Sequence, residues 1–182
     1  KPGMMVADVG AGTGFYSLRV AREIGPGGVV YAEDIQPGML EKLNANASAQ
    51  HVANVVTVLG TEADPRLPAG KLDLVLLVDV YHEFSRPQRM LDRIRDSLKP
   101  DGRLVLPEFR KEDPSVPIRP EHKMSVDDVR AEVTPEGYRL ENVMVTLPWQ
   151  HINSFQTSGA RQESSPRHKV IYRTQSCRPP AP

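Results

Sequence analysis

The stretch Asp8-Val9-Gly10-Ala11-Gly12-Thr13-Gly14 (DVGAGTG) decides the fold of this chain. The apolar run 4–9 ends in it and predicts a buried strand, while residues 13–24 carry apolar side chains at helical spacing, beginning with Phe15. Glycines between a strand and a helix let the backbone turn tightly and approach a ligand with no side chain between them. The stretch therefore predicts a ligand-binding loop in an α/β unit, and the alternative is a plain glycine-rich turn.

The following 100 residues alternate between strand and helix patterns. Helices are predicted from Pro37 and from Pro87, the second with Ser85 as its N-cap, and Lys99-Pro100-Asp101-Gly102 predicts a turn. Strands are predicted at 29–33, 54–59, 72–80 and 103–106. This alternation predicts a doubly wound α/β fold, a mostly parallel sheet with helices on both faces.

The pattern changes after the strand at 103–106. Residues 109–124 predict a surface loop, Ser125 opens a short helix with a capping box, and strands follow at 138–147 and 150–155. We therefore predict one domain over residues 1–155. Residues 156–182 are rich in Ser, Arg and Pro and predict a poorly ordered tail, in which 170–172 alternatively add a short edge strand.

Composition excludes several classes of protein. The 182 residues carry 23 basic and 23 acidic side chains, and a net charge of zero disfavours a dedicated nucleic-acid binder. The single cysteine, Cys177, excludes an intrachain disulfide framework and a thiolate metal cluster, and we predict no metal site. No run of 18 apolar residues is present, so we expect no membrane association and a cytoplasmic location.

The spacing of the glycines narrows the choice of ligand class. A dinucleotide-binding loop reads G-x-G-x-x-G, whereas the residue in the last glycine position here is Phe15 and the stretch reads acid-x-G-x-G-x-G. Two acids, Glu33 and Asp34, end the next predicted strand, where a carboxylate can accept hydrogen bonds from ribose hydroxyls. We expect Asp34 to bind the ligand and Glu33 to be a solvated surface acid.

These motifs together resemble the class I S-adenosylmethionine-dependent methyltransferases of small molecules. Residues 8–14 are similar to that family's first motif, and residues 34–40 (DIQPGML) to its D-x-x-P-x-M-L stretch. Residues 73–84 and 98–104 (LKPDGRL) resemble its fourth strand and the turn before its fifth, so the resemblance covers about residues 3–151. It implies a seven-stranded sheet whose last strand is antiparallel, with S-adenosylmethionine as cofactor and S-adenosylhomocysteine as its product.

The resemblance also implies which residues hold the cofactor. Asp8 would lie near the charged methionine end and Asp79 would face the amino group, while the ribose would lie on Asp34 beside Ile35. The adenine would lie against residues 60–67, where Glu62 or Asp64 replaces the acid that the family has directly after the glycine. The cofactor-binding set is Asp8, Gly10, Ala11, Gly12, Gly14, Asp34, Ile35, Glu62, Asp64 and Asp79.

The catalytic candidates follow the predicted fourth and fifth strands. Methyl transfer from a sulfonium needs alignment more than a protein nucleophile, although a base helps when the acceptor must lose a proton. His82 is the candidate base, Tyr81 is next to it, and Glu108 would orient the acceptor. Each of the three has a structural alternative, in which it satisfies local polar groups. We expect a small-molecule acceptor.

Only three residues precede Met4, whereas the family carries helices there that cover the cofactor. Either the site is open, or a partner or second copy of the chain covers it, or the sequence is a fragment. Two rival functions remain. One is a NAD-dependent oxidoreductase, for which the chain lacks the G-x-G-x-x-G loop, and the other is a non-catalytic binding or scaffold domain.

Overall fold

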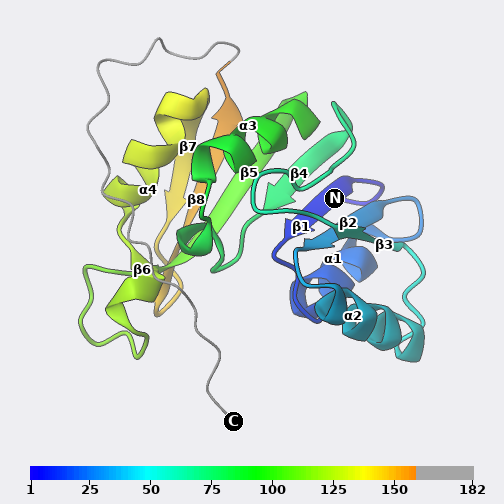
Figure 1. Cartoon of the computed structure of the whole chain (residues 1–182). Coiled ribbons are helices and arrows are strands. Elements are labelled where there is room, and N and C mark those ends of the chain that lie inside the picture. The colour runs from blue at the N-terminus through cyan, green and yellow to red at the C-terminus, as the bar shows by residue number, and fades with distance from the viewer. Residues whose placement is uncertain (159–182) are drawn as a thin grey trace.

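A twisted sheet forms the centre of this computed structural model, which describes residues 1–158 (Figure 1). The strands run in the order β3-β2-β1-β4-β5-β8-β7, and the two-residue β6 pairs with β5. Their bounds are β1 (Met5–Val9), β2 (Val29–Asp34), β3 (Val55–Leu59), β4 (Leu72–Leu76), β5 (Leu98–Arg110), β6 (Lys123–Met124), β7 (Tyr138–Met144) and β8 (Gln150–Thr157). Only β8 runs opposite to the others, since it pairs antiparallel with both β5 and β7. The predicted doubly wound sheet with a late antiparallel strand is confirmed.

Helices cover both faces of this sheet because apolar side chains alternate along its strands. On β1, Val6 packs with the helix residues Ala21 and Ile24 on one face, while Ala7 and Val9 pack into the larger core on the other. The helices are α1 (Phe15–Ile24), α2 (Pro37–Ala49), α3 (Pro87–Ser97) and α4 (Val126–Val133), with short 3-10 turns η1 (Tyr81–Glu83), η2 (Pro120–His122) and η3 (Thr134–Glu136). α1 and α2 lie on one face and α3 and α4 on the other. No helix among residues 1–158 is long and apolar enough to cross a membrane.

The strand order places a crevice between β1 and β4. The chain moves from β1 outward to β2 and β3, then returns to add β4 on the other side of β1. The loops that leave the carboxyl ends of β1 and β4 therefore diverge to opposite sides, which opens a space for a ligand. The Gly10–Gly14 loop and the residues after β4 meet at this point.

Two helix starts differ from the sequence prediction. α3 begins at Pro87 with Arg86 as its N-cap, and Ser85 does not cap it, because the Ser85 hydroxyl instead donates a hydrogen bond to Glu62. α1 begins at Phe15 rather than at residue 13, and its buried side includes the polar Ser17. Phe15 is 59% exposed and is not part of the buried stripe that the spacing predicted. The capping box of α4 is present as predicted, with Ser125 and Asp128 as its two members.

The predictions of one turn, one strand and one loop also need correction. The predicted turn 99–102 is a bulge inside β5, because Leu72 pairs with Leu98 but Leu74 pairs with Arg103. Asp73 stabilises this bulge by accepting hydrogen bonds from Lys99 Nζ at 2.5 Å and from the backbone of Met5 at 2.7 Å. The strand predicted over 72–80 ends at Leu76. The predicted loop 109–124 includes the end of β5, η2 and both residues of β6, which pair with Phe109 and Arg110.

The predicted domain end at residue 155 falls inside β8, which continues through Gln156 and Thr157. These two residues were expected in the tail, but they pair with Arg139 and Tyr138 of β7. The rest of the predicted tail, 159–182 with its alternative strand at 170–172, lies outside the described residues.

The hydroxyl of Tyr138 joins β7 to α3, since it donates a buried hydrogen bond of 2.8 Å to the carbonyl of Leu91. Tyr138→Phe should lower the free energy of unfolding by about 1 kcal/mol, because the carbonyl loses this partner. Thermal unfolding measures the change. The matched control is Tyr31→Phe, at a half-buried tyrosine of β2. An equal loss in both variants would contradict a specific role for the Tyr138 bond.

Candidate cofactor and acceptor site

The loop after β1 gives its backbone amides to the two acids that end β2. The Gly10 amide hydrogen bonds to the Glu33 carboxylate, and the Ala11 amide donates to the Glu33 carbonyl at 2.8 Å. The Gly12 amide donates to Asp34 Oδ2 at 2.9 Å. Three consecutive amides therefore bind groups of the protein itself, and the glycine loop is fixed against β2.

Both acids at the end of β2 are buried, so the expectation that Glu33 is a solvated surface acid is wrong. Glu33 is 1% exposed and Asp34 is 7% exposed. Asp34 also accepts a hydrogen bond of 2.8 Å from the Gln36 amide, just before α2. Glu33 Oε1 has no hydrogen-bond partner among the described residues. A Cβ atom on Gly60, directly after β3, would lie only 1.8 Å from that oxygen, so any side chain there would have to displace the Glu33 carboxylate.

Burial makes Asp8 and Glu33 costly to ionise. Desolvation raises the pKa of Asp8 to about 6, although its hydrogen bond from the Ser17 hydroxyl, at 2.5 Å, acts in the opposite direction. Desolvation likewise raises the pKa of Glu33 to about 8, opposed by the Gly10 amide and increased by the charges of Asp34 and Asp8. A positively charged ligand beside these acids would favour their ionised forms.

A cleft of about 180 Å³ opens beside these acids. One side is formed by Glu33, Asp34 and Ile35, and the other by the segment that follows β4, including Val80 and Phe84. Gly10 permits this close approach, because a Cβ atom on it would lie 2.5 Å from Val80 Cγ2. The position of Ile35, which is 51% exposed, gives the cleft an apolar margin.

The two acids proposed for the adenine end are separated by the structure. Glu62 lines the cleft together with Thr61, and it accepts the hydrogen bond from Ser85. Asp64 is outside the cleft lining, where it accepts a hydrogen bond of 2.8 Å from the Arg66 amide and lies 3.9 Å from Arg93. Glu62 therefore lines the same cleft as Asp34, whereas Asp64 makes local contacts outside it.

Asp79 occupies a strained position after β4. Its φ of 51° lies in the left-handed region, which non-glycine residues seldom adopt. Oδ2 accepts a hydrogen bond of 2.6 Å from Gln150 Nε2, while Oδ1 is buried without a partner among residues 1–158. Burial raises the pKa of Asp79, opposed by the Gln150 bond. Asp79 does not line the same cleft as Asp34, although its unpartnered oxygen could accept a ligand amino group.

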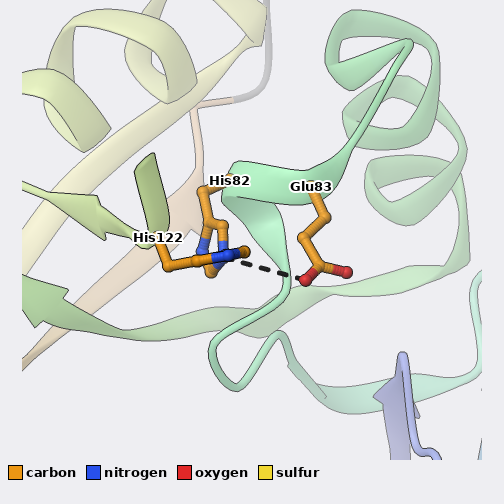
Figure 2. Close-up of side chains that lie close together, drawn as sticks. All are labelled: His82, Glu83 and His122. Carbon is orange, nitrogen blue, oxygen red and sulfur yellow. Dashed lines mark hydrogen bonds and ion pairs between the residues drawn. The ribbon is translucent and has the colours of Figure 1, made fainter. Parts of the chain in front are cut away.

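His82 and Glu108 form a buried pair across the ends of β4 and β5. His82 Nδ1 lies 2.8 Å from Glu108 Oε2, and the Glu108 side chain is 0% exposed. His82 Nε2 lies 3.1 Å from His122 Nδ1, and Figure 2 shows these two rings side by side with Glu83 nearby. Burial alone would lower the pKa of His82, but the hydrogen bond to Glu108 and the charges of Glu108, Glu83 and Asp79 raise it.

Tyr81 does not join this group. Its side chain is buried in the main core, where it packs edge-to-face against Phe84, and its hydroxyl donates a hydrogen bond of 3.1 Å to Glu132 on α4. Burial is also the main cause that raises the pKa of Tyr81. The side chains of Tyr81 and His82 diverge because they are adjacent on the short turn η1. The structure therefore places the Tyr81 side chain in the packed core, apart from the contact between His82 and His122.

Four residues outside the predicted catalytic and cofactor-binding sets lie against residues of those sets. Ser17 binds Asp8, Gln150 binds Asp79, and His122 with Glu83 lies beside His82. Ser17 had a readable signal, since a polar residue on the inner side of an amphipathic helix is unusual. The His122–His82 and Gln150–Asp79 contacts join segments 40 and 71 residues apart, so no local pattern could reveal them.

Comparison with known proteins agrees with this geometry. The profile of a family described as "Methyltransferase domain" matches residues 1–156. A solved S-adenosylmethionine-dependent methyltransferase from Aquifex aeolicus is 27% identical, with a TM-score of 0.82 over 86% of this chain and 84% of that chain. Nocamycin O-methyltransferase from Saccharothrix syringae is 35% identical over 106 residues, which are 58% of this chain and 38% of that protein. Carboxy-S-adenosyl-L-methionine synthase from Enterobacter is 31% identical over 156 residues, 80% of this chain and 63% of that protein.

The fold, the glycine loop and the buried acids beside it thus define a class I domain that binds a nucleoside cofactor. The chain belongs to the methyltransferase domain family. The predicted membership among class I S-adenosylmethionine-dependent methyltransferases is confirmed, as is the cofactor of that family. The chain spans 38% and 63% of the length of the two curated relatives described above.

The raised pKa of Glu33 predicts a pH-dependent stability in the absence of cofactor. Between pH 4.5 and about 8 the carboxyl group stays protonated in the folded protein but ionises in the unfolded chain. Its contribution to stability is therefore complete below pH 4.5 and is lost as the pH rises through about 8.

Glu33→Gln should remove this loss. Between pH 6.5 and pH 8.5 the free energy of unfolding of wild type should fall by up to about 2 kcal/mol more than that of the variant, since a difference of one bound proton corresponds to about 1.4 kcal/mol per pH unit. Thermal unfolding at the two pH values measures this fall. The matched control is Glu41→Gln, at an exposed position on α2. If Glu33→Gln shows the same pH dependence as wild type and the control, the carboxyl group of Glu33 is ionised at neutral pH.

Proposed function

We propose that the chain transfers a methyl group from S-adenosylmethionine to a small-molecule acceptor by in-line displacement. The observation that carries this proposal is the pairing of the glycine-loop amides of Gly10 and Gly12 with Glu33 and Asp34. This arrangement places buried carboxylates, rather than free amide donors, at the ligand-facing end of β1 and β2.

The same pairing argues against the dinucleotide alternative. In a dinucleotide-binding loop the backbone amides point at the pyrophosphate, which needs donors and a positive potential. Here three of these amides already have acceptors, and Asp8, Glu33 and Asp34 lie around them. A diphosphate would meet negative charge, whereas a ligand with a sulfonium, an amino group and ribose hydroxyls meets acceptors.

The residues present fit such a ligand. Glu33 Oε1 is a buried acceptor without a partner among the described residues, and it lies at the cleft with Asp34, so both can accept hydrogen bonds from ribose hydroxyls. Asp8 and Asp79 offer negative charge toward the methionine end, and Thr61 and Glu62 line the adenine end. We propose these residues with Gly10, Ala11, Gly12, Gly14 and Ile35 as the cofactor-binding set, and we remove Asp64 from it.

The protein contributes alignment and acid–base chemistry. The bound cofactor supplies an activated methyl group on a positively charged sulfur. The chain must hold the acceptor in line with it, which is worth roughly 7–11 kcal/mol when the geometry is well ordered. His82 is the proposed base, because Glu108 accepts its Nδ1–H and leaves on Nε2, which faces His122 Nδ1 at 3.1 Å, the lone pair that can take up a proton. Glu108 is a positioning residue that holds the ring.

Several predictions about the whole protein stay proposals. A small-molecule acceptor is supported by relatives whose names contain the small molecules nocamycin and carboxy-S-adenosyl-L-methionine. The absence of nucleic-acid partners, a second copy or partner that covers the cleft, and the cytoplasmic location stay predictions. The non-catalytic alternative differs from the enzyme in one measurable way, since it would bind S-adenosylmethionine without turning it over on any acceptor.

Thermal shift with S-adenosylhomocysteine and NAD in parallel tests the cofactor. A ligand at 100 times its Kd stabilises the folded protein by about 2.7 kcal/mol, roughly a 5–10 °C rise in Tm. We expect this rise with S-adenosylhomocysteine and no change with NAD. Stabilisation by NAD alone would overturn the proposed function.

Asp34→Asn tests the ribose contact. The amide side chain can replace only one of the two carboxylate oxygens as an acceptor, so the affinity for S-adenosylhomocysteine should fall at least tenfold, about 1.4 kcal/mol. Isothermal titration measures the affinity, and circular dichroism checks the fold. Asp101→Asn, at an exposed acid in the bulge of β5, is the matched control. Equal affinities in wild type and Asp34→Asn would remove Asp34 from the site.

A further inference from the structure

Three side chains from two distant segments converge beside the acceptor side of the site. His82 and Glu83 lie on η1, and His122 ends η2 40 residues later (Figure 2). One nitrogen of each histidine and a carboxylate oxygen of Glu83 all lie within 4.8 Å of one another. Each of these atoms has a lone pair that can bind a metal ion, so the arrangement is a candidate ligand set.

Glu108 orients this set from behind. It is fully buried, and its Oε2 lies 2.8 Å from His82 Nδ1. A carboxylate can only accept at this contact, so the proton of a neutral His82 is on Nδ1 and the lone pair is on Nε2. That lone pair faces His122 Nδ1 at 3.1 Å. A carboxylate that fixes the ring and the tautomer from the opposite nitrogen is the usual support of a metal-binding histidine.

The distances are close to those of a metal site before binding. With Zn–N bonds of about 2.0–2.1 Å, two ligands of a tetrahedral ion are about 3.3 Å apart. The two histidine nitrogens are 3.1 Å apart, and His82 Nε2 lies 3.9 Å from Glu83 Oε1. All three ligand atoms lie within 4.8 Å of one another, and Glu83 is 60% exposed, so its side chain can move closer to the two nitrogens without disturbing the core.

The surrounding charge also favours a cation. The carboxylates of Glu108, Glu83 and Asp79 all act on His82. Lys123, which follows His122 in the chain, turns away and donates its hydrogen bonds to the carbonyls of Asp113 and Val116. A positive ion between the two histidines would therefore meet negative charge on several sides.

We propose that His82 Nε2, His122 Nδ1 and the Glu83 carboxylate bind one divalent transition-metal ion of the Zn²⁺ or Co²⁺ type. Two imidazoles and one carboxylate suit such ions, whereas Mg²⁺ and Ca²⁺ prefer oxygen ligands alone. Without a metal, His122 Nδ1 carries the proton that it donates to His82 Nε2. When the metal binds, this proton moves to His122 Nε2. Both facing nitrogens then offer lone pairs to the metal, and the two histidines keep the same number of protons.

Three protein ligands leave at least one coordination position open, as in catalytic rather than structural zinc sites. Glu83 also lines the cleft beside Asp34 and Gly10, so the open position lies next to the cofactor cleft. The metal would lower the proton affinity of an acceptor oxygen bound at this position, so that the oxygen loses its proton more easily. The metal would then take over the role that the proposed function gives to His82. This consequence for the acceptor rests on the proposed function, whereas the metal site itself does not.

Titration of the chelator-treated, tag-free chain with Co²⁺ tests the site. We expect one Co²⁺ per chain with a visible absorption band, and a change in that band when azide occupies the open position. His122→Gln and Glu83→Gln should each weaken Co²⁺ binding at least about tenfold, in line with the loss seen when a metal site loses a supporting group. The matched control is His51→Asn, since His51 lies at the end of α2 with a positive φ that asparagine tolerates.

The outcomes separate the proposals. The metal site would be overturned if wild type formed no one-to-one complex with Co²⁺. It would also be overturned if His122→Gln and Glu83→Gln bound Co²⁺ as tightly as wild type and His51→Asn do. Circular dichroism of Glu83→Gln, at an exposed position, guards against loss of fold as the cause of weakened binding. Affinity for S-adenosylhomocysteine is measured separately in EDTA. Its absence would overturn the proposed function and leave the Co²⁺ result unaffected.

Discussion

The structure depends on the hydrogen bonds between the loop after β1 and the acids that end β2. The amides of Gly10, Ala11 and Gly12 all donate to Glu33 or Asp34. These bonds fix the direction in which the chain enters α1, and they hold two carboxylates at the edge of the sheet with little exposure to water. Burial of the acids raises the pKa of Glu33 and Asp8, so the site holds unfavourable electrostatic energy that a cationic ligand would relieve.

The order of the parallel strands brings the rest of the site to that loop. Because β4 is added on the opposite side of β1 from β2, the segment after β4 faces the glycine loop across the crevice. Val80 reaches Gly10 there, and Glu62 from the loop after β3 lines the same cleft as Asp34. The antiparallel β8 then supplies Gln150 to Asp79. One strand order thus places acids that end β2 and follow β3 around one cleft, with Asp79 after β4 outside its lining.

Local sequence patterns predicted the fold well where local forces decide it. The glycine loop, the proline at the start of α2 and the capping box of Ser125 each depend on neighbours within a few residues, and all three are present. The prediction failed where a distant partner competed. Ser85 is a good N-cap by type, but Glu62 takes its hydroxyl. Lys99-Pro100-Asp101-Gly102 has the composition of a turn, but pairing with β4 and the Lys99–Asp73 contact hold it as a bulge within β5.

The sequence by itself determined the α/β order, the glycine loop and the acids at the ends of the predicted strands, because strand and helix periodicity and backbone freedom at glycine are local properties. Only the tertiary structure decided what those acids do. Glu33, which sequence reasoning had placed in solvent, is buried against Gly60. The tertiary structure also turned the Tyr81 side chain into the core. It also brought His122 to His82 and placed Glu108 behind them, since β4, β5 and η2 meet only in the folded sheet. Contacts between residues far apart in the chain follow from strand order, and no local pattern encodes them.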